Sequence, residues 1–241
     1  MSILSLERVS KRYGAVVVAD EIDMSVAEGE ALGIIGPNGA GKTSLFNLIT
    51  GSVRVDSGTI RFRDVDITGM SAANRCRLGI SRSFQVPHPF VGMTVFENVV
   101  VGAAFGAGRS ERASYSRAVE VLEIAGLMHK ANTVAGSLTL LERKRLEMAR
   151  ALATDPKLLL LDEIAGGLTE AECQELVATV TELRKTGISI VWIEHIVHAL
   201  TAIVDRLIVI NFGRLIANGE PKAVIASPEV AEIYLGIEAD A

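Results

Sequence analysis

The chain has 241 residues and a formal net charge of −5, without a block of basic residues. This length allows one large domain or two small ones, and the acidic balance argues against nucleic acid as the main partner. Hydrophobic residues make up 49% of the chain, yet no apolar run approaches the ~20 residues that span a bilayer, so we expect any membrane connection to come through a partner protein.

Two features of the sequence indicate the compartment. Cys76 and Cys173 lie far apart and form no metal-binding or disulfide pattern, which suits a reducing environment. Charge appears already at Glu7 and Arg8, which is too early for a signal peptide. We therefore expect a cytosolic protein.

The first part of the chain predicts a small antiparallel sheet. Residues 3–9 alternate like a half-buried strand, and a second strand starts at residues 15–18 after a turn at Tyr13-Gly14. Residues 59–63 read as a strand with one polar face. We expect these strands to lie beside a parallel core.

A glycine-rich motif follows the first fully apolar strand. Residues 31–35 read as a buried strand, and residues 44–50 read as a helix that Gly51 closes. Between them stands Gly36-Pro37-Asn38-Gly39-Ala40-Gly41-Lys42-Thr43. Strand, glycine-rich turn and helix are the context that the P-loop motif requires, and this context disfavours the alternative of an ordinary turn.

This motif predicts a nucleoside triphosphate site. The main-chain N–H groups of the loop, and of the helix start that includes Ser44, bind phosphate oxygens. Lys42 is expected to reach the outer phosphates, and the Thr43 hydroxyl to ligate Mg²⁺. Tyr13, upstream of the loop, can stack on adenine; the alternative is an ordinary packed surface tyrosine.

The pattern becomes helical in the middle of the chain. Residues 80–85 read as a strand that ends at Gln85, and the two prolines within residues 86–90 predict a stiff, exposed loop. The helical pattern continues to about residue 154. We therefore predict a single domain with an inserted helical lobe at residues 85–154 and a core lobe at residues 1–84 and 155–241.

Two helices of this lobe have recognisable ends. One is predicted over residues 94–101, where Glu97 completes a capping box with Thr94. The other is predicted over residues 110–125. The segment 102–108 between them is rich in small residues, so we expect it to be flexible.

Two carboxylates follow another buried strand. Residues 157–163 deliver Asp162 and Glu163 at the C-terminal end of the strand, the edge where ligands bind in open α/β sheets. Asp162 can hold Mg²⁺ through water, and Glu163 can orient or deprotonate an attacking water. A plain strand end is the alternative, which the P-loop upstream disfavours. His195 follows the predicted strand 188–193, and a lone histidine there is usually structural.

The remaining segments complete an α/β fold. A helix is predicted over residues 170–185, and residues 206–210 and 215–217 form a hairpin around Phe212-Gly213. Residues 222–226 and 228–234 read as short closing helices. We predict a P-loop (RecA-like) core with an antiparallel β flank and a helical lobe.

With these pieces in order, the chain resembles the ABC-type ATPases over essentially its whole length. Walker A is residues 36–43, Walker B is residues 158–162, and Glu163 is the acid that follows it. The resemblance matches Gln85 to the Q-loop glutamine, His195 to the switch histidine and Tyr13 to the aromatic residue that stacks on adenine. It implies hydrolysis of ATP with Mg²⁺, with catalytic roles for Glu163, His195 and Gln85, and a metal site at Thr43, Gln85 and Asp162.

Within this superfamily, the chain resembles the ATP-binding subunits of branched-chain amino acid importers, the LivG type. The similar segments are residues 81–85, 93–99, 145–152 and 216–236. The resemblance implies a homo- or heterodimer of ATPase subunits on the cytoplasmic face of the cell membrane. It also implies two membrane permease subunits as partners and a periplasmic protein that supplies the solute.

The signature segment departs from the family pattern. Leu-Ser-Gly-Gly-Gln is replaced by Leu138-Thr139-Leu140-Leu141-Glu142, a stretch that in such proteins contacts the γ-phosphate bound by the other subunit. Thr139 keeps the hydroxyl, and Thr139 with Glu142 forms a capping box, so the helix start is retained. Leu140 and Leu141 add bulk at that phosphate and Glu142 adds an acid, unless the leucines turn away. Two further departures are Ile164 in place of a proline and Thr169 in place of the Asp or Asn of the D-loop.

These observations favour the energising subunit of an ABC importer for amino acids. Its composite site would combine residues of one subunit with the Thr139–Glu142 segment of the other. Two alternatives remain at this point: the ATPase of a lipopolysaccharide-type exporter, and a soluble regulatory ABC ATPase.

Overall fold

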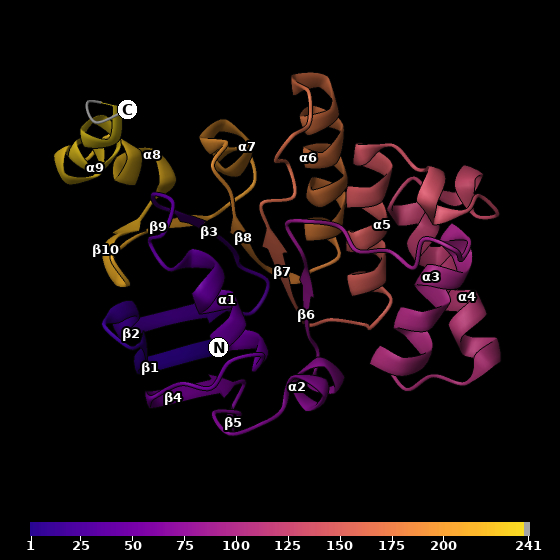
Figure 1. The fold of residues 1–241 in the computed structure, drawn as a ribbon, viewed down its shortest axis with the longest axis horizontal. Coiled ribbons are helices and arrows are strands. Elements are labelled where there is room, and N and C mark those ends of the chain that lie inside the picture. Colours follow the sequence, from indigo (N-terminus) through magenta and orange to yellow (C-terminus); the bar gives the residue numbers. More distant parts are fainter. Residues whose placement is uncertain (239–241) are drawn as a thin grey trace. The chain divides into compact units, whose positions relative to one another are not determined.

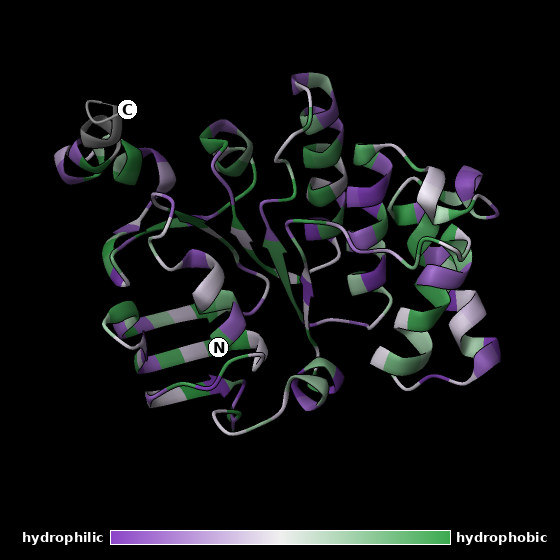
Figure 2. Ribbon diagram, in the orientation of Figure 1, coloured by the Kyte–Doolittle hydropathy of each residue, from purple (hydrophilic) through white to green (hydrophobic). Residues whose placement is uncertain are grey.

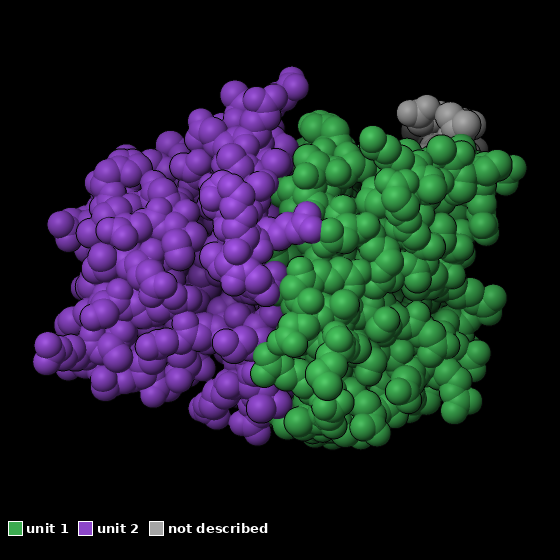
Figure 3. Space-filling model, turned by 180° about the vertical axis from the view of Figure 1, so that it is seen from behind, with its two compact units in different colours: residues 1–71, 189–241 green, residues 72–188 purple. Residues whose placement is uncertain are grey.

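The computed structural model describes residues 1–238, which fall into two compact units. Unit 1 contains residues 1–71 and 189–241, and unit 2 contains residues 72–188. Figure 3 colours unit 1 green and unit 2 purple. The helical lobe expected at residues 85–154 lies within unit 2; its exact bounds stay a prediction.

Unit 1 contains an antiparallel sheet and strands of a second, mixed sheet (Figure 1). Its strands are β1 (Ser2–Tyr13), β2 (Val16–Ala27), β3 (Ala31–Ile35), β4 (Ser57–Phe62), β5 (Val65–Asp66), β8 (Ser189–Ile193), β9 (Arg206–Asn211) and β10 (Arg214–Gly219). The antiparallel sheet has the order β2-β1-β4-β5. In the mixed sheet, β3 is parallel to both β8 and β9, and β9 is antiparallel to β10. The predicted parallel core and antiparallel flank are therefore both present.

Hydrophobic patterning explains why the two sheets differ. Every residue of β3 and of β8 is buried, and continuous apolar runs of this kind form strands that are covered on both faces. β2 and β4 instead alternate between buried and exposed positions, so one face of this sheet is solvated. Figure 2 shows the antiparallel strands banded in green, white and purple.

Among the described residues of unit 1, three of the four helices follow the end of a strand. The four helices are α1 (Lys42–Thr50), α7 (Val197–Thr201), α8 (Pro221–Ile225) and α9 (Pro228–Glu238), which follows α8. α1 ends at Gly51, whose φ of 75° is left-handed and whose N–H donates to the Leu48 carbonyl oxygen. This is the glycine termination that the sequence predicts.

Unit 2 combines two parallel strands with helices. Its elements are α2 (Ala72–Leu78), β6 (Ile80–Ser83), α3 (Val95–Val101), the π-helix η1 (Gly102–Gly106), α4 (Glu111–Ile124), the 3₁₀ turns η2 (Met128–Lys130) and η3 (Ala135–Ser137), α5 (Leu140–Leu152), β7 (Leu158–Asp162) and α6 (Glu170–Lys185). β6 pairs in parallel with β7. α3, α5 and α6 each begin with a complete capping box of a threonine and the glutamate three residues later. Among residues 1–238, no helix is long and apolar enough to cross a bilayer.

The segment after α3 is ordered as a helix, so the expectation of a flexible stretch at residues 102–108 is wrong for its first five residues. η1 continues α3 with π-helical turns. A Cβ at Gly102 would lie 2.7 Å from the Arg150 carbonyl oxygen, and a Cβ at Gly106 would overlap the Thr154 side chain. The glycines there permit close packing of η1 against the end of α5.

A glycine also holds β4 against β1. Gly58 has a φ of 88°, and a Cβ there would overlap the Arg8 carbonyl oxygen and lie 2.6 Å from that of Glu7. The register of the two strands shifts between Glu7 and Ser10. Gly14 has a similar φ of 59° but open space around it.

We predict that Gly58→Ala destabilises the protein by about 3 kcal/mol, because the left-handed backbone and the overlap with β1 both add to the cost. Gly14→Ala is the matched control and should cost about 1 kcal/mol, since it pays only for the backbone conformation. The free energies of unfolding in urea test this difference. Equal losses in the two variants would contradict it.

Candidate functional site

The phosphate loop lies between β3 and α1. The chain leaves β3 through Gly36 and reaches α1 through Gly39 and Gly41, with φ values of 154°, 79° and 104°. Positive φ values are strained for residues with a side chain, so these glycines allow the tight loop. The first N–H groups of α1 have no partner within the helix and are the donors that a phosphate needs.

Main chain from other strands supports this loop. A Cβ at Gly36 would overlap the Ile210 carbonyl oxygen, and a Cβ at Gly41 would overlap that of Val18. The Gly213 N–H, in the turn between β9 and β10, donates to the Ala40 carbonyl oxygen at 2.9 Å. The hairpin predicted around Phe212-Gly213 therefore packs directly against the phosphate loop.

Lys42 places a buried ammonium group on the same loop. Its Nζ donates to the carbonyl oxygens of Gly36 at 2.7 Å and Pro37 at 3.0 Å. The positive charge thus lies beside the loop whose N–H groups are suited to an anion. A phosphate oxygen is a stronger acceptor than these carbonyls because it is charged.

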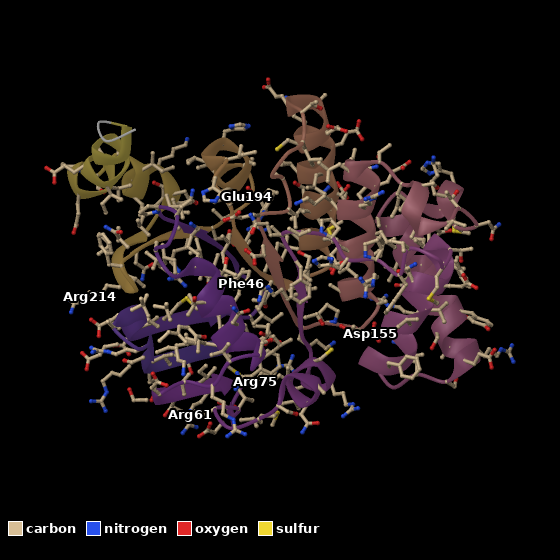
Figure 4. The ribbon with its side chains drawn as sticks, viewed as in Figure 1. Phe46, Arg61, Arg75, Asp155, Glu194 and Arg214 are labelled. Carbon is tan, nitrogen blue, oxygen red and sulfur yellow. The ribbon has the colours of Figure 1, made fainter. Side chains whose placement is uncertain are left out.

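Two more predicted site residues belong to unit 1. The Tyr13 side chain is 50% exposed, and Lys11 Nζ lies 5.4 Å from its ring centroid. An exposed ring of this kind has the surface that stacking on a base requires. His195 is exposed and follows the buried Glu194, whose Oε2 accepts the His195 N–H at 3.2 Å. Figure 4 labels Glu194 just beyond the end of β8.

The two acidic residues predicted for the site, Asp162 and Glu163, lie in unit 2 at the end of β7, as predicted. Asp162 is 1% exposed, and its Oδ2 accepts a hydrogen bond from the Arg82 guanidinium on β6. The charge of this buried carboxylate is therefore balanced within the unit. Glu163 is also buried and has a φ of 46°. A non-glycine residue with this backbone is strained and is kept there only by its surroundings.

The structure brings Gln85 and Glu163 together. Gln85 Nε2 donates to Glu163 Oε2 at 2.5 Å. β6 and β7 run in parallel with Ser83 opposite Leu161, so the residues just beyond the two strands reach the same edge. The predicted glutamine and carboxylate therefore form one hydrogen-bonded pair.

The altered signature segment starts α5 with its capping box intact. The Thr139 hydroxyl accepts the Glu142 N–H at 3.3 Å, and the Glu142 carboxylate accepts the Thr139 N–H at 2.9 Å. The Thr139 N–H, with Lys130 at 3.1 Å as a further contributor, lowers the pKa of Glu142 below its usual value. The acid is therefore held in the cap as a carboxylate.

The two leucines of this segment have different environments. Leu141 is 8% exposed and belongs to the core of unit 2, whereas Leu140 is 43% exposed. A Cβ at Gly167 would lie 3.3 Å from Leu140 Cδ2. One leucine turns away from the surface, and Leu140 alone of the pair stays largely accessible.

Two charged residues of unit 2 were not identified from the sequence. Arg82 is the one charge in the short, otherwise buried strand β6, next to the strand that ends at Asp162. Lys144 lies on the apolar stripe of α5, three residues after Leu141 and four before Met148. Such residues could be found from the sequence as charges at positions where the pattern is otherwise apolar. A charge buried at such a position almost always has a partner, which indicates a specific role.

The predicted residues fall into two groups. Unit 1 holds Tyr13, the phosphate loop at residues 36–44 and His195. Unit 2 holds Gln85, the signature segment at residues 138–142, Asp162 and Glu163. The hydrogen bonds described above for each group lie within its own unit.

Comparisons with known proteins show which family the chain resembles over nearly its whole length. Residues 19–166 match the family model described as "ABC transporter". The chain is 35% identical to the high-affinity branched-chain amino acid transport ATP-binding protein LivG of Salmonella typhimurium, over 97% of this chain and 98% of that protein. It is equally similar, at 35% identity over 98% of both chains, to the probable branched-chain amino acid transport ATP-binding protein LivG of Methanocaldococcus jannaschii. A crystal structure of the ADP conformation of an ATP-binding cassette from an ABC transporter superimposes with a TM-score of 0.89 at 35% identity, covering 98% of this chain and 99% of that one.

The different environments of the two leucines yield a test. Leu141→Ala should destabilise the protein by about 2 kcal/mol, because it leaves a cavity in the core of unit 2. Leu140→Ala should change the free energy of unfolding by no more than about 0.5 kcal/mol, as is usual at accessible positions. Chemical denaturation of both variants measures the two values. A loss at residue 140 that equals the loss at residue 141 would show that both leucines are core residues.

Proposed function

Because the chain belongs to the ABC transporter family of ATP-binding proteins, we propose that it is the ATP-hydrolysing subunit of an importer for branched-chain or related amino acids. The observation that carries this proposal is the near full-length likeness to branched-chain amino acid transport ATP-binding proteins of a bacterium and an archaeon. The ordered phosphate loop and the hydrogen bond from Gln85 to the buried Glu163 add the chemistry that ATP hydrolysis needs.

The residues of unit 1 bind the nucleotide in this proposal. Main-chain N–H groups of residues 36–44 and the Lys42 ammonium bind the phosphates, and Tyr13 stacks on the adenine. His195 contacts the γ-phosphate. The supporting observations are the buried position of the Lys42 side chain on its loop and the exposure of the Tyr13 ring.

The metal and the attacking water are assigned to residues with oxygen ligands. Mg²⁺ prefers carboxylate, hydroxyl and carbonyl oxygens together with substrate phosphates. Thr43, Gln85 and Asp162 offer these ligand types, so the residues fit the ion. When bound, Mg²⁺ neutralises charge on the phosphates. Glu163 accepts a proton from the attacking water, and Gln85 holds the Glu163 carboxylate at Oε2.

The assembly is proposed from family likeness. A second ATP-binding subunit supplies its signature segment, with the Thr139 hydroxyl and the first N–H groups of α5, to the γ-phosphate. Two permease subunits hold this pair of ATPases at the cytoplasmic face of the membrane, and a periplasmic solute-binding protein delivers the amino acid to them.

The surface proposed to meet the permease lies just after Gln85. Val86, Phe90 and Val91 are exposed apolar residues within a short segment. Their loop is held in place: the buried Asn98 side chain accepts the Phe90 N–H at 2.8 Å and donates to its carbonyl oxygen at 3.1 Å. The Arg150 guanidinium donates to the His88 carbonyl oxygen and lies 4.9 Å from the Phe90 ring centroid. A preformed apolar surface loses little conformational entropy on binding.

The role of Glu163 as base is tested by Glu163→Gln. This change removes the base but keeps the shape, so ATP turnover should fall by roughly 10²–10⁴ while ATP binding persists. ATPase assays of the full chain, alone and with its permease partners, measure turnover, and gel filtration with ATP measures dimer formation. Glu182→Gln, at an exposed position of α6, is the control and should hydrolyse ATP at the parent rate. Parent-rate hydrolysis by Glu163→Gln would remove Glu163 from its role.

The docking surface and the solute are tested together by uptake of labelled leucine in a reconstituted transporter. Phe90→Asp should abolish uptake and leave the ATPase activity of the isolated subunit intact, because a charge would be buried against the permease. Phe105→Asp is the control, since Phe105 is also exposed but lies on η1. Normal uptake by Phe90→Asp would place the interface elsewhere, and no uptake by the parent transporter would exclude leucine as a solute.

A further inference from the structure

Three residues of unit 2 form a closed ring of hydrogen bonds. Lys144 Nζ, on α5, donates to the main-chain oxygen of Gln85 at 2.6 Å and to that of Glu163 at 3.1 Å. Gln85 Nε2 in turn donates to Glu163 Oε2 at 2.5 Å. The segment after β6, the segment after β7 and helix α5 thus meet at one ammonium group.

Lys144 is a buried cation, with only 3% of its surface exposed. Removing an ammonium group from water is costly unless hydrogen-bond acceptors replace the water. Hydrogen bonds with an ionised donor are stronger than neutral ones. The two carbonyl oxygens therefore stabilise the buried charge, and the charge in turn resists any movement of either carbonyl.

The contact with Glu163 lies at a strained point of the backbone. Glu163 has a φ of 46°, and its carbonyl oxygen also accepts the Gly166 N–H at 3.3 Å. Such a conformation persists only where the surroundings enforce it. The φ and ψ of a residue set the direction in which its side chain leaves the backbone, so the Lys144 contact helps to set where the Glu163 carboxylate lies.

The contact with Gln85 fixes the other partner of that carboxylate. Lys144 holds the main chain of Gln85, and the Gln85 side chain holds Glu163 Oε2. One residue therefore controls both ends of the Gln85–Glu163 hydrogen bond. Lys144 is also five residues after Thr139, the N-cap of α5, so the ring is attached to the helix that begins with the signature segment.

We propose that Lys144 is a positioning residue for ATP hydrolysis. It holds the backbones of Gln85 and Glu163 so that the carboxylate of Glu163 faces the water it activates, and it touches neither the nucleotide nor that water. This inference rests on the proposed role of Glu163 as the base. Its effect is therefore on turnover and not on ATP binding.

Lys144→Met tests the inference, because it keeps the length and apolar stem of the side chain and removes the ammonium group. We expect kcat of the full chain to fall about 10- to 100-fold, the loss typical of a displaced catalytic group. The dissociation constant for ATP should stay unchanged. Lys144→Arg keeps a charged donor and should recover most of the lost kcat. Should Lys144→Met not fold, Lys144→Gln, which keeps a single neutral donor, takes its place with the same expectation.

Arg117→Met is the matched control for a loss of packing. Arg117 is a part-buried cation of the same unit. It donates to the Leu152 carbonyl oxygen and forms an ion pair with Asp155, which is labelled in Figure 4. Neither of these contacts involves Gln85 or Glu163. Its melting temperature and kcat are measured beside those of the Lys144 variants. If Arg117→Met lowers kcat as much as Lys144→Met at a similar melting temperature, the effect is structural and the inference is wrong.

Glu163→Gln, measured in the same assay, separates this inference from the proposed function. If Glu163→Gln turns over ATP at the parent rate, Glu163 is not the base, and the inference about Lys144 is wrong with it. If Glu163→Gln is inactive while Lys144→Met keeps the parent kcat, the positioning role of Lys144 is overturned. A fall in kcat for Lys144→Met, with recovery in Lys144→Arg and little change in Arg117→Met, supports it.

Discussion

Main chain packs directly on main chain where the phosphate loop of unit 1 meets β2 and the hairpin of β9 and β10. At Gly36 and Gly41, the space for a side chain is already filled by carbonyl oxygens of Ile210 and Val18. The carbonyl oxygens of these strands therefore help to set the shape of the loop. Donors that are fixed before a phosphate arrives cost little reorganisation when it binds.

Unit 2 orders its own predicted site residues by a different means. There the key groups are buried ions: Asp162 is paired with Arg82, and Lys144 is bonded to the backbones of Gln85 and Glu163. Buried charges are costly to leave unpaired, so such a network has few alternative arrangements. In unit 1, glycines let the phosphate loop approach the neighbouring strands closely. In unit 2, paired or hydrogen-bonded charges hold the predicted site residues in place.

The sequence predicts those features that depend on local chemistry. The apolar runs of β3 and β8, the capping boxes at Thr94 and Thr139, and the hairpin turn at Phe212-Gly213 all follow from neighbours within a few residues. The order of the motifs was enough to place the family. Helix α2, with its buried Arg75, was not recognised, because its seven residues are too few for a clear helical period.

Features that depend on distant contacts could not be predicted. Gly102 and Gly106 look like flexible linker residues until Arg150 and Thr154 are seen to pack against them. Leu140 and Leu141 are the same residue type at adjacent positions. Only the packing of α5 shows that Leu140 is accessible and that Leu141 belongs to the core. The roles of Arg82 and Lys144 likewise depend on partners that are distant in the sequence.

The capping box at the start of α5 has a consequence for how this segment evolves. Thr139 and Glu142 bond to each other's backbone N–H groups, so the helix begins correctly whatever stands between them. Of the two intervening positions, Leu141 is constrained by the core of its own chain. Leu140 is not, so selection on residue 140 acts mainly through whatever molecule faces it. Mutation at that one position lets a subunit diverge toward a particular partner without loss of its own fold.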